Sequence, residues 1–207
     1  MTLGAVIRSF STPVANPQGL AWDGRALWLC TSSSSILYRI DPRDGTVIRT
    51  ITSPGSIPTA LTWDGRALWL GSVGTDLIHQ IDPRDGTAIR SFSAPADALQ
   101  GFDWYGGKLW GVDSGNDLVY QIDPRDGTVI RSFAAPSTSP RGIAVFGPTA
   151  WLIDADTALL YQIDLRDGTV IRSASTPSTS PRAPVVDGRS LWMIESIDQE
   201  IHQLSLQ

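Results

Sequence analysis

Cysteine, lysine and histidine are scarce in this chain of 207 residues, and each scarcity excludes a kind of chemistry. The single cysteine, Cys30, cannot form a disulfide within the chain and provides neither a redox pair nor a cysteine-ligated zinc site. Lys108 is the only lysine and the formal net charge is −5, so the composition lacks the basic surface that nucleic-acid binding requires. The sequence contains no His-Glu zinc motif, nucleophile elbow or glycine-rich phosphate loop. These absences argue against a nucleic-acid partner and against a familiar catalytic motif.

Long apolar runs are also missing. No stretch approaches the roughly 20 apolar residues of a membrane-spanning helix, and the first residues lack the basic-then-apolar pattern of a signal peptide. With 42% hydrophobic and 18% charged residues, the composition is that of a globular chain. We therefore expect a soluble monomer with no membrane partner and no signal peptide in this sequence, in a compartment that the composition does not identify.

Internal repetition is the strongest feature of the sequence. The phrase Ile-Asp-Pro-Arg-Asp-Gly-Thr occurs at 40–46, 81–87 and 122–128, and it returns at 163–169 with leucine in place of proline. Tryptophan keeps the same 41-residue interval at Trp28, Trp69, Trp110, Trp151 and Trp192. Five such copies account for nearly the whole chain, so we expect residues 1–207 to form one repeat domain.

Each copy predicts four short strands and leaves no room for a helix. In the first copy, apolar runs at 19–22, 26–29, 37–40 and 46–51 are separated by turn sequences. Asp23-Gly24 is a two-residue hairpin signal, and the Asp-Pro-Arg-Asp-Gly sequence at 41–45 has proline and glycine where a tight turn needs them. A repeat of roughly 40–45 residues with four antiparallel strands is typical of a β-propeller blade.

The phase of the repeat at the two ends predicts a closed ring. Residues 4–10 match the fourth strand of a copy, whereas residues 201–204 match the third. The N-terminal strand would then complete the last blade and remove both exposed sheet edges. The predicted fold is all-β, a five-bladed β-propeller with a composite fifth blade. The repeated tryptophans are expected to form core between neighbouring blades rather than a surface for ligand stacking.

The phrases Gly-Leu-Ala-Trp-Asp-Gly-Arg-Ala-Leu-Trp-Leu at 19–29 and Leu-Tyr-Arg-Ile-Asp-Pro-Arg-Asp-Gly-Thr-Val-Ile-Arg at 37–49 resemble the repeats of a superfamily of bacterial propellers. That superfamily includes glutamine-cyclotransferase-like, virginiamycin-lyase-like and quinoprotein-like repeat proteins. The resemblance covers the whole chain, is carried by structural residues and implies a propeller. The cyclotransferase relatives are five-bladed enzymes with a motif similar to Glu-Gly-Leu at the start of a first strand and Glu-Ser after a second.

This chain departs from the cyclotransferase motif. The first-strand position lacks glutamate in every copy and holds Gln18, Thr59, Gln100, Arg141 and Arg182. Only Glu195-Ser196 matches the second element. The resemblance therefore implies the fold more firmly than the cyclase activity.

Differences between the copies concentrate on one predicted face, the top, which carries the loops after each second strand and the connections between copies. Loops on a rigid scaffold often carry binding residues, so we expect the ligand-binding residues there. Eleven acidic residues fall in the opposite, bottom hairpins, where aspartate is expected to serve as a turn acceptor. The other ten are predicted to lie on or near the top: Asp76, Asp97, Asp103, Asp113, Asp117, Asp154, Asp156, Glu195, Asp198 and Glu200.

One top-face column suggests a cation site. The residue directly after the second strand is Thr31, Ser72, Asp113, Asp154 or Glu195 in successive copies. Three carboxylates in equivalent places could provide hard oxygen ligands for Ca²⁺ or Mg²⁺. In the alternative interpretation the same carboxylates accept hydrogen bonds from loop amides, and Arg141 and Arg182 neutralise the charge.

Two classes of function remain open. The first is a non-catalytic scaffold that binds a small molecule, a glycan or a protein through its top face or its inter-blade clefts. The second is an enzyme with one site at the top mouth of the channel, cyclotransferase-like or lyase-like, with or without a divalent cation. The candidate ligand-binding residues are Gln100, Asp103, Asp113, Arg141, Asp154, Arg182 and Glu195. The number of ligands bound per chain would discriminate between the two classes.

Overall fold

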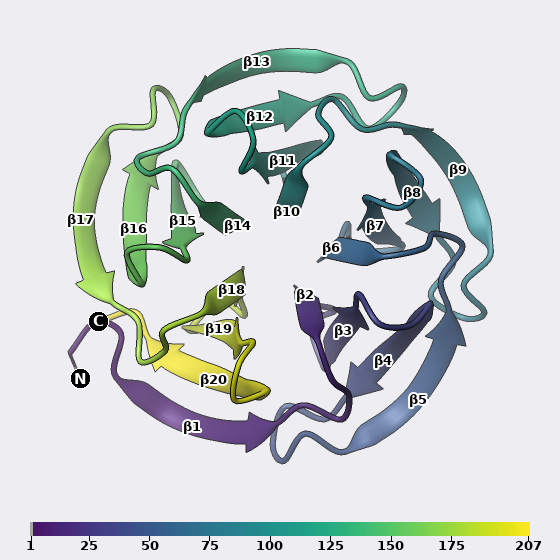
Figure 1. Cartoon of the computed structure of the whole chain (residues 1–207), viewed down its shortest axis with the longest axis horizontal. Coiled ribbons are helices and arrows are strands. Elements are labelled where there is room, and N and C mark those ends of the chain that lie inside the picture. Colours follow the sequence, from purple (N-terminus) through teal and green to yellow (C-terminus); the bar gives the residue numbers. More distant parts are fainter. Residues whose placement is uncertain (1) are drawn as a thin grey trace.

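The structure, a computed structural model that describes residues 2–207, is a ring of five four-stranded antiparallel sheets (Figure 1). Strands alone make up the regular structure of these residues, as the repeat predicted. Residues 2–207 contain no helix that is long and apolar enough to cross a membrane.

Each blade runs from an innermost strand at the ring axis to an outermost strand at the perimeter. Blade 1 consists of β2 (Pro17–Trp22), β3 (Leu27–Thr31), β4 (Ile36–Ile40) and β5 (Val47–Thr52). Blade 2 consists of β6 (Pro58–Trp63), β7 (Leu68–Ser72), β8 (Leu77–Ile81) and β9 (Ala88–Ser93). Blade 3 consists of β10 (Leu99–Tyr105), β11 (Lys108–Asp113), β12 (Leu118–Ile122) and β13 (Val129–Ala134). Blade 4 consists of β14 (Pro140–Phe146), β15 (Thr149–Asp154), β16 (Leu159–Asp164) and β17 (Val170–Ser175). Blade 5 consists of β18 (Pro181–Val186), β19 (Ser190–Glu195), β20 (Glu200–Ser205) and β1 (Val6–Ser11).

The first strand of the chain closes the ring. Strand β1 pairs antiparallel with β20, with Phe10 opposite Ile201, and so becomes the outermost strand of blade 5. The two ends of the chain accordingly lie close together at this blade (Figure 1). The predicted composite blade is confirmed, and β20 is left with no unpaired edge.

The five innermost strands approach each other so closely that the axis is almost filled. A Cβ on Gly101 would lie 2.8 Å from the Cα of Gly142, and a Cβ on Gly142 would collide with the ring of Pro184. Glycine is therefore required where β10, β14 and β18 meet. The remaining axial cavity has a volume of about 10 Å³, room for about one water molecule, so a ligand could not pass through the ring.

The repeated tryptophans form the core between blades. Each is at most 3% exposed. Trp28 of blade 1 packs with Leu61 and Leu68 of blade 2, and the other tryptophans make the corresponding contacts around the ring. This confirms their structural assignment.

Bottom-hairpin aspartates are turn acceptors, as expected. Asp23 Oδ1 accepts hydrogen bonds from the amides of Arg25 and Ala26 at 2.9 and 2.8 Å. Its Oδ2 accepts from Trp28 Nε1 at 3.0 Å and from Arg39 Nε at 2.7 Å. Although burial opposes ionisation, these donors lower the pKa of Asp23. The hairpin and the buried tryptophan are thus held by one carboxylate.

Candidate functional site: the top mouth of the ring

Five polar side chains occupy the second position of the innermost strands, at the end where each strand enters from the top face. We call them the mouth ring: Gln18, Thr59, Gln100, Arg141 and Arg182. In blades 1 to 4 this residue has no partner in the pairing between first and second strands, because the register shifts there. A β-bulge of this kind re-aims a side chain that would otherwise follow the pleat. The fold therefore sets Gln18, Thr59, Gln100 and Arg141 apart from the regular sheet, whereas Arg182 pairs with Ile194 and the register shifts just after it.

Two guanidinium groups lie on adjacent blades of the mouth ring. Arg141 Nη1 donates to Gln100 Oε1 at 3.1 Å, and Arg182 Nη1 donates to Gln18 Oε1 at 2.9 Å. Gln18 Nε2 donates in turn to Ser32 Oγ at 3.3 Å. The two amides thus hold the arginines from opposite sides, since Gln100 belongs to blade 3 and Gln18 to blade 1.

The charges of these two arginines are incompletely compensated. Burial, followed by the positive charge of Arg141, lowers the pKa of Arg182, while Glu195 opposes this shift. The Nε atoms of both arginines are buried and have no hydrogen-bond partner. A guanidinium has five N–H donors, and the glutamine contact occupies one of them on each arginine. Such a pair of under-bonded, like-charged groups favours an anion.

The predicted acidic column ends the second strands, opposite the residue that precedes each mouth-ring position, and accepts hydrogen bonds from its own loops. Asp113 Oδ1 accepts from the amides of Gly115 and Asn116, and its Oδ2 accepts from the Ala98 amide at 3.1 Å. Asp154 and Glu195 make the corresponding contacts in blades 4 and 5, to the Thr157 and Ser139 amides and to the Ile197 and Ser180 amides. All three are at most 2% exposed. These contacts correspond to the capping interpretation of the column.

The three carboxylates therefore join the loop after each second strand to the connection that precedes the blade. Thr31 and Ser72 make the equivalent link through their hydroxyls, which donate to Ala15 O and Ser56 O. Within residues 2–207 no group of three or more His, Cys, Asp or Glu side chains is arranged to hold a metal ion. Each carboxylate works within its own blade, and they do not converge on one centre.

The ionisation of Asp154 illustrates this structural role. Its burial raises the pKa, but hydrogen bonds from side-chain hydroxyls and loop amides, including both donors of Thr157, more than offset that effect. The net result is a pKa below the ordinary value, so Asp154 is a charged acceptor of loop hydrogen bonds at neutral pH.

The expected top-face position of Asp103 was wrong. It lies in the second half of β10, opposite Trp110 and close to the Gly106-Gly107 turn, and therefore toward the bottom face. Asp103 Oδ1 accepts from Thr62 Oγ1 of blade 2 at 2.8 Å, and Oδ2 accepts from the Val145 amide of blade 4 at 2.8 Å. Asp103 shares its repeat position with Ala21, two residues before the Asp23-Gly24 bottom hairpin, so the repeat itself places it near the bottom face. Its contacts make it a link between three blades.

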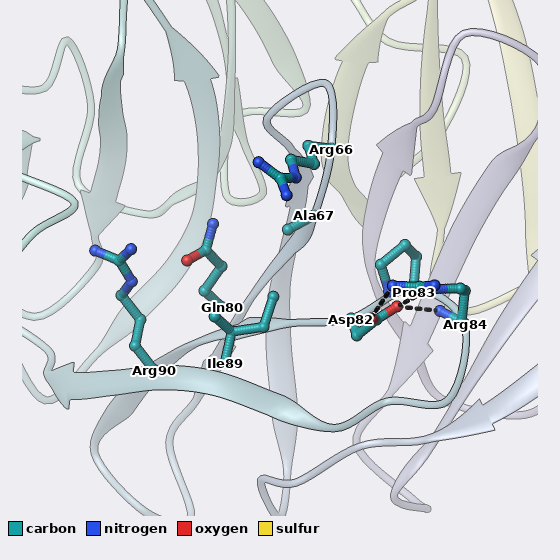
Figure 2. A pocket seen from close by; sticks show the side chains of 8 residues that line it. All are labelled: Arg66, Ala67, Gln80, Asp82, Pro83, Arg84, Ile89 and Arg90. Carbon is teal, nitrogen blue, oxygen red and sulfur yellow. Dashed lines mark hydrogen bonds and ion pairs between the residues drawn. The ribbon is translucent and has the colours of Figure 1, made fainter.

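The sequence analysis missed a pocket at the bottom rim of blade 2 (Figure 2). Its volume is about 340 Å³, and its polar lining includes Arg66, Gln80 and Arg90. A pocket of about 450 Å³ in blade 1 is lined by residues at equivalent repeat positions, among them Arg25, Arg39 and Arg43. The only sequence signal was the recurrence of arginine in these bottom-face columns.

Comparison with known proteins gives a likeness of fold. No family model and no curated protein sequence matches the chain. Among solved structures, glutaminyl cyclase from Myxococcus xanthus superposes with a TM-score of 0.83 at 14% identity, over 98% of this chain and 96% of the other. Virginiamycin B lyase from Staphylococcus aureus, solved as a catalytically inactive variant with quinupristin, superposes with a TM-score of 0.60 at 19% identity, over 95% of this chain and 68% of the other. Hydrazine synthase from Kuenenia stuttgartiensis superposes with a TM-score of 0.60 at 20% identity, over 88% of this chain and 56% of the other.

The shared architecture is the propeller. The resemblance inferred from the repeat phrases, to cyclase-like and lyase-like bacterial propellers, thus extends to three-dimensional structure. At identities of 14 to 20%, these matches show that the fold is shared, but they do not show that the chemistry of any site is shared.

Proposed function

We propose that this protein is a non-catalytic binding propeller that holds a small oxyanion-bearing molecule, a carboxylate or a phosphate, at the top mouth. The observation that carries the proposal is the Arg141 and Arg182 pair, with two buried Nε atoms that lack partners. Bonds between a charged donor and an anion contribute roughly 1.5–3 kcal/mol each, about twice the value for neutral pairs. An oxyanion contacting both guanidiniums would also offset the burial and the repulsion from Arg141 that lower the pKa of Arg182.

The chemistry of the mouth ring favours binding over catalysis. Amide and hydroxyl groups do not titrate near neutral pH, and arginine stays protonated well above it. General acid–base catalysis needs a group whose pKa lies near the operating pH. None of Gln18, Thr59, Gln100, Arg141 and Arg182 is such a group. The nearby Glu195 is occupied by the Ile197 and Ser180 amides.

The narrow axis supports a ligand that sits on the mouth rather than one that threads the ring. The axial cavity below the mouth ring is about 10 Å³ and is lined largely by glycine and apolar side chains, among them Leu61, Phe102 and Ile143. An anion would therefore meet polar groups only at the top.

Titration calorimetry with acetate, succinate, inorganic phosphate and sulfate tests the proposal. We expect saturable binding at one mouth site per chain. Arg182→Gln and Arg141→Gln should each weaken it roughly 10- to 100-fold, because each removes a charged donor. Arg189→Gln is the matched control, since Arg189 is an exposed bottom-hairpin arginine of the same blade as Arg182. If Arg189→Gln weakens binding as much as Arg182→Gln does, the anions associate nonspecifically and the proposal fails.

A second candidate is an enzyme at the same mouth, since glutaminyl cyclase has the same fold over nearly the full length of both chains. Glu195-Ser196 is the element of this chain that matches the cyclotransferase-like motif. A peptide with N-terminal glutamine discriminates between the candidates. Formation of a cyclised product that disappears in Glu195→Gln would favour the enzyme, whereas unchanged peptide would favour the binding protein.

A further inference from the structure

The five blades offer an internal comparison at the bottom rim, because each outermost strand carries an arginine at the same repeat position: Arg8, Arg49, Arg90, Arg131 and Arg172. Three of the five donate to a backbone carbonyl in the bottom hairpin of the next blade, and Arg172 donates to Leu206 O, which follows β20 at the equivalent repeat position. Arg131, for example, bonds Leu165 O at 2.7 Å and Arg166 O at 2.9 Å. Among the residues that the structure describes, Arg90 is the one that makes no such bond.

The strand next to Arg90 shows the same difference. In blades 3 and 4 the neighbouring glutamine accepts from the arginine, with Gln121 Oε1 at 3.0 Å from Arg131 Nε and Gln162 Oε1 at 2.7 Å from Arg172 Nε. In blade 2 the equivalent oxygen, Gln80 Oε1, is buried and has no partner. The orientation of the Gln80 amide is fixed because its Nε2 donates to Asp64 Oδ2 at 3.0 Å. The acceptor that is occupied in blades 3 and 4 is therefore left open in blade 2, as it also is in blade 5, where Gln203 Oε1 is buried without a partner.

The aromatic packing differs in parallel. The guanidiniums of Arg49, Arg131 and Arg172 lie 5.0 to 5.3 Å from the ring centroids of the tryptophans of their own blades. Trp69, the corresponding tryptophan of blade 2, stacks instead on Trp104 of blade 3, at 5.9 Å and an interplanar angle of 13°. Arg90 thus lacks the carbonyl bond that its four counterparts make and the tryptophan contact that three of them make.

Arg90 lines the pocket of Figure 2, in which Gln80 lies between Arg66 and Arg90 while Asp82 and Arg84 line the other end. Arg84 is occupied by Asp82, with 2.9 Å between Nη2 and Oδ2, and this pairing lowers the pKa of Asp82. Arg66 and Arg90 are left to provide the uncompensated positive charge. Ala67, Pro83 and Ile89 supply an apolar wall.

We propose that this blade 2 pocket is a second binding site, selective for a phosphate group that carries a proton. Two oxygens of the phosphate accept hydrogen bonds from Arg66 and Arg90, and its hydroxyl donates to Gln80 Oε1, in the role that the Nε–H of arginine has in blades 3 and 4. Near neutral pH inorganic phosphate retains at least one proton, whereas sulfate has none; a phosphate monoester, whose second pKa is about 6, retains a proton only below that pH. The buried acceptor therefore selects phosphate over sulfate, because a site built around a buried acceptor rejects an analogue without the donor. At about 340 Å³ the pocket is large enough for an organic substituent on the phosphate.

Arginine-detected NMR of the Nε–Hε groups in the full chain tests the proposal, with inorganic phosphate and sulfate as probes. We expect the Arg66 and Arg90 signals to move saturably with phosphate, and sulfate to bind this site at least 10-fold more weakly. Arg90→Gln should reduce the phosphate affinity at least 10-fold. Arg131→Gln, the matched change in blade 3, should leave it unchanged, because Arg131 is already bonded to Gln121 and to blade 4. Signals of Arg141 and Arg182 report the mouth separately, so the two proposals can fail independently.

Three outcomes would overturn the proposal: an Arg90 Nε–H already bonded to Gln80 and insensitive to phosphate, equal affinity for phosphate and sulfate, or an equal loss in Arg90→Gln and Arg131→Gln. A third probe, glucose 6-phosphate, distinguishes the source of the phosphate. At about pH 5, where both probes carry a proton, tighter binding than inorganic phosphate identifies a phosphate monoester as the ligand, and equal or weaker binding identifies the free ion.

Discussion

Asp103 Oδ2 accepts a hydrogen bond from the backbone N–H of Val145 at 2.8 Å, so that one carboxylate of blade 3 holds the innermost strand of blade 4. Its other oxygen accepts from Thr62 Oγ1 of blade 2 and from the Trp104 amide, each at 2.8 Å. Three donors from three blades thus converge on a single buried side chain. This makes Asp103 a structural link rather than a top-face ligand.

Asp103→Asn should destabilise the protein. An amide keeps one acceptor oxygen, so either the Val145 amide or the Thr62 and Trp104 donors lose their partner. A buried donor without a partner costs roughly 1–3 kcal/mol. Chemical denaturation at pH 7 measures the difference, with Asp97→Asn in an exposed top connection as a control that should change little. A stability equal to that of the parent would show that the three contacts do not hold the blades.

The difference in stability between the parent and Asp103→Asn should depend on pH. Burial raises the pKa of Asp103 despite its three donors. The native state then holds the Asp103 proton to a higher pH than the unfolded chain, whose aspartates titrate near about 4. The stabilisation that this bound proton contributes is fully present below the pKa of Asp103 in the unfolded chain. It is lost as pH rises through the higher pKa of Asp103 in the folded protein. The stability advantage of the parent over Asp103→Asn should therefore shrink as pH rises from about 4. An advantage that grows over this range would contradict the direction of the shift.

Two tryptophans with different indole partners give a matched stability test. Trp69 Nε1 donates to Asp64 Oδ2 at 2.8 Å, whereas Trp110 Nε1 is buried without a partner. Truncation of either to alanine should cost roughly 3–5 kcal/mol through a core cavity. Replacement by phenylalanine should cost a different amount of unfolding free energy at the two positions, because Trp69→Phe breaks a hydrogen bond to a carboxylate whereas Trp110→Phe removes an unsatisfied donor. We expect the larger loss of unfolding free energy for Trp69→Phe. The opposite order would show that cavity size, not the indole hydrogen bond, decides the cost.

Deletion of residues 1–10 tests ring closure. Without β1, the edge of β20 would be exposed, and Phe10 would be lost from the cluster that contains Trp192. Thermal denaturation and size-exclusion chromatography should reveal loss of the cooperative transition or pairing between chains. A monomer that melts at the parent temperature would contradict closure by this strand.

Calcium titration tests the carboxylate column. Because the oxygens of Asp113, Asp154 and Glu195 accept hydrogen bonds from loop donors, we expect no rise in melting temperature with Ca²⁺ or Mg²⁺. Asp154→Asn should instead lower it, through the loss of an acceptor for the Ser139 or Thr157 amide. A calcium-dependent rise that disappears in Asp154→Asn would restore the cation site.

The 41-residue repeat predicted the blades, their strands and the composite fifth blade, because turn sequences such as Asp23-Gly24 and the alternation of apolar runs are local properties. It also predicted that Arg141 and Arg182 lie on neighbouring blades. The bulges that set Gln18 and its equivalents apart depend on register and were not predicted, and neither were the contacts of Asp103 with blades 2 and 4. The blade 2 pocket could not be predicted either, since Arg90 occupies the same repeat position as Arg131 and differs only in what surrounds it.

The most direct test of the account is the response of individual arginines to a carboxylate. With succinate as the probe, NMR of the Nε–Hε groups should show Arg141 and Arg182 shifting together along one saturable curve, while the exposed Arg25, Arg43 and Arg189 respond only weakly and without saturation. If all arginines respond alike, or if the mouth pair does not move at saturating succinate while the exposed arginines do, the top mouth is not an anion-binding site.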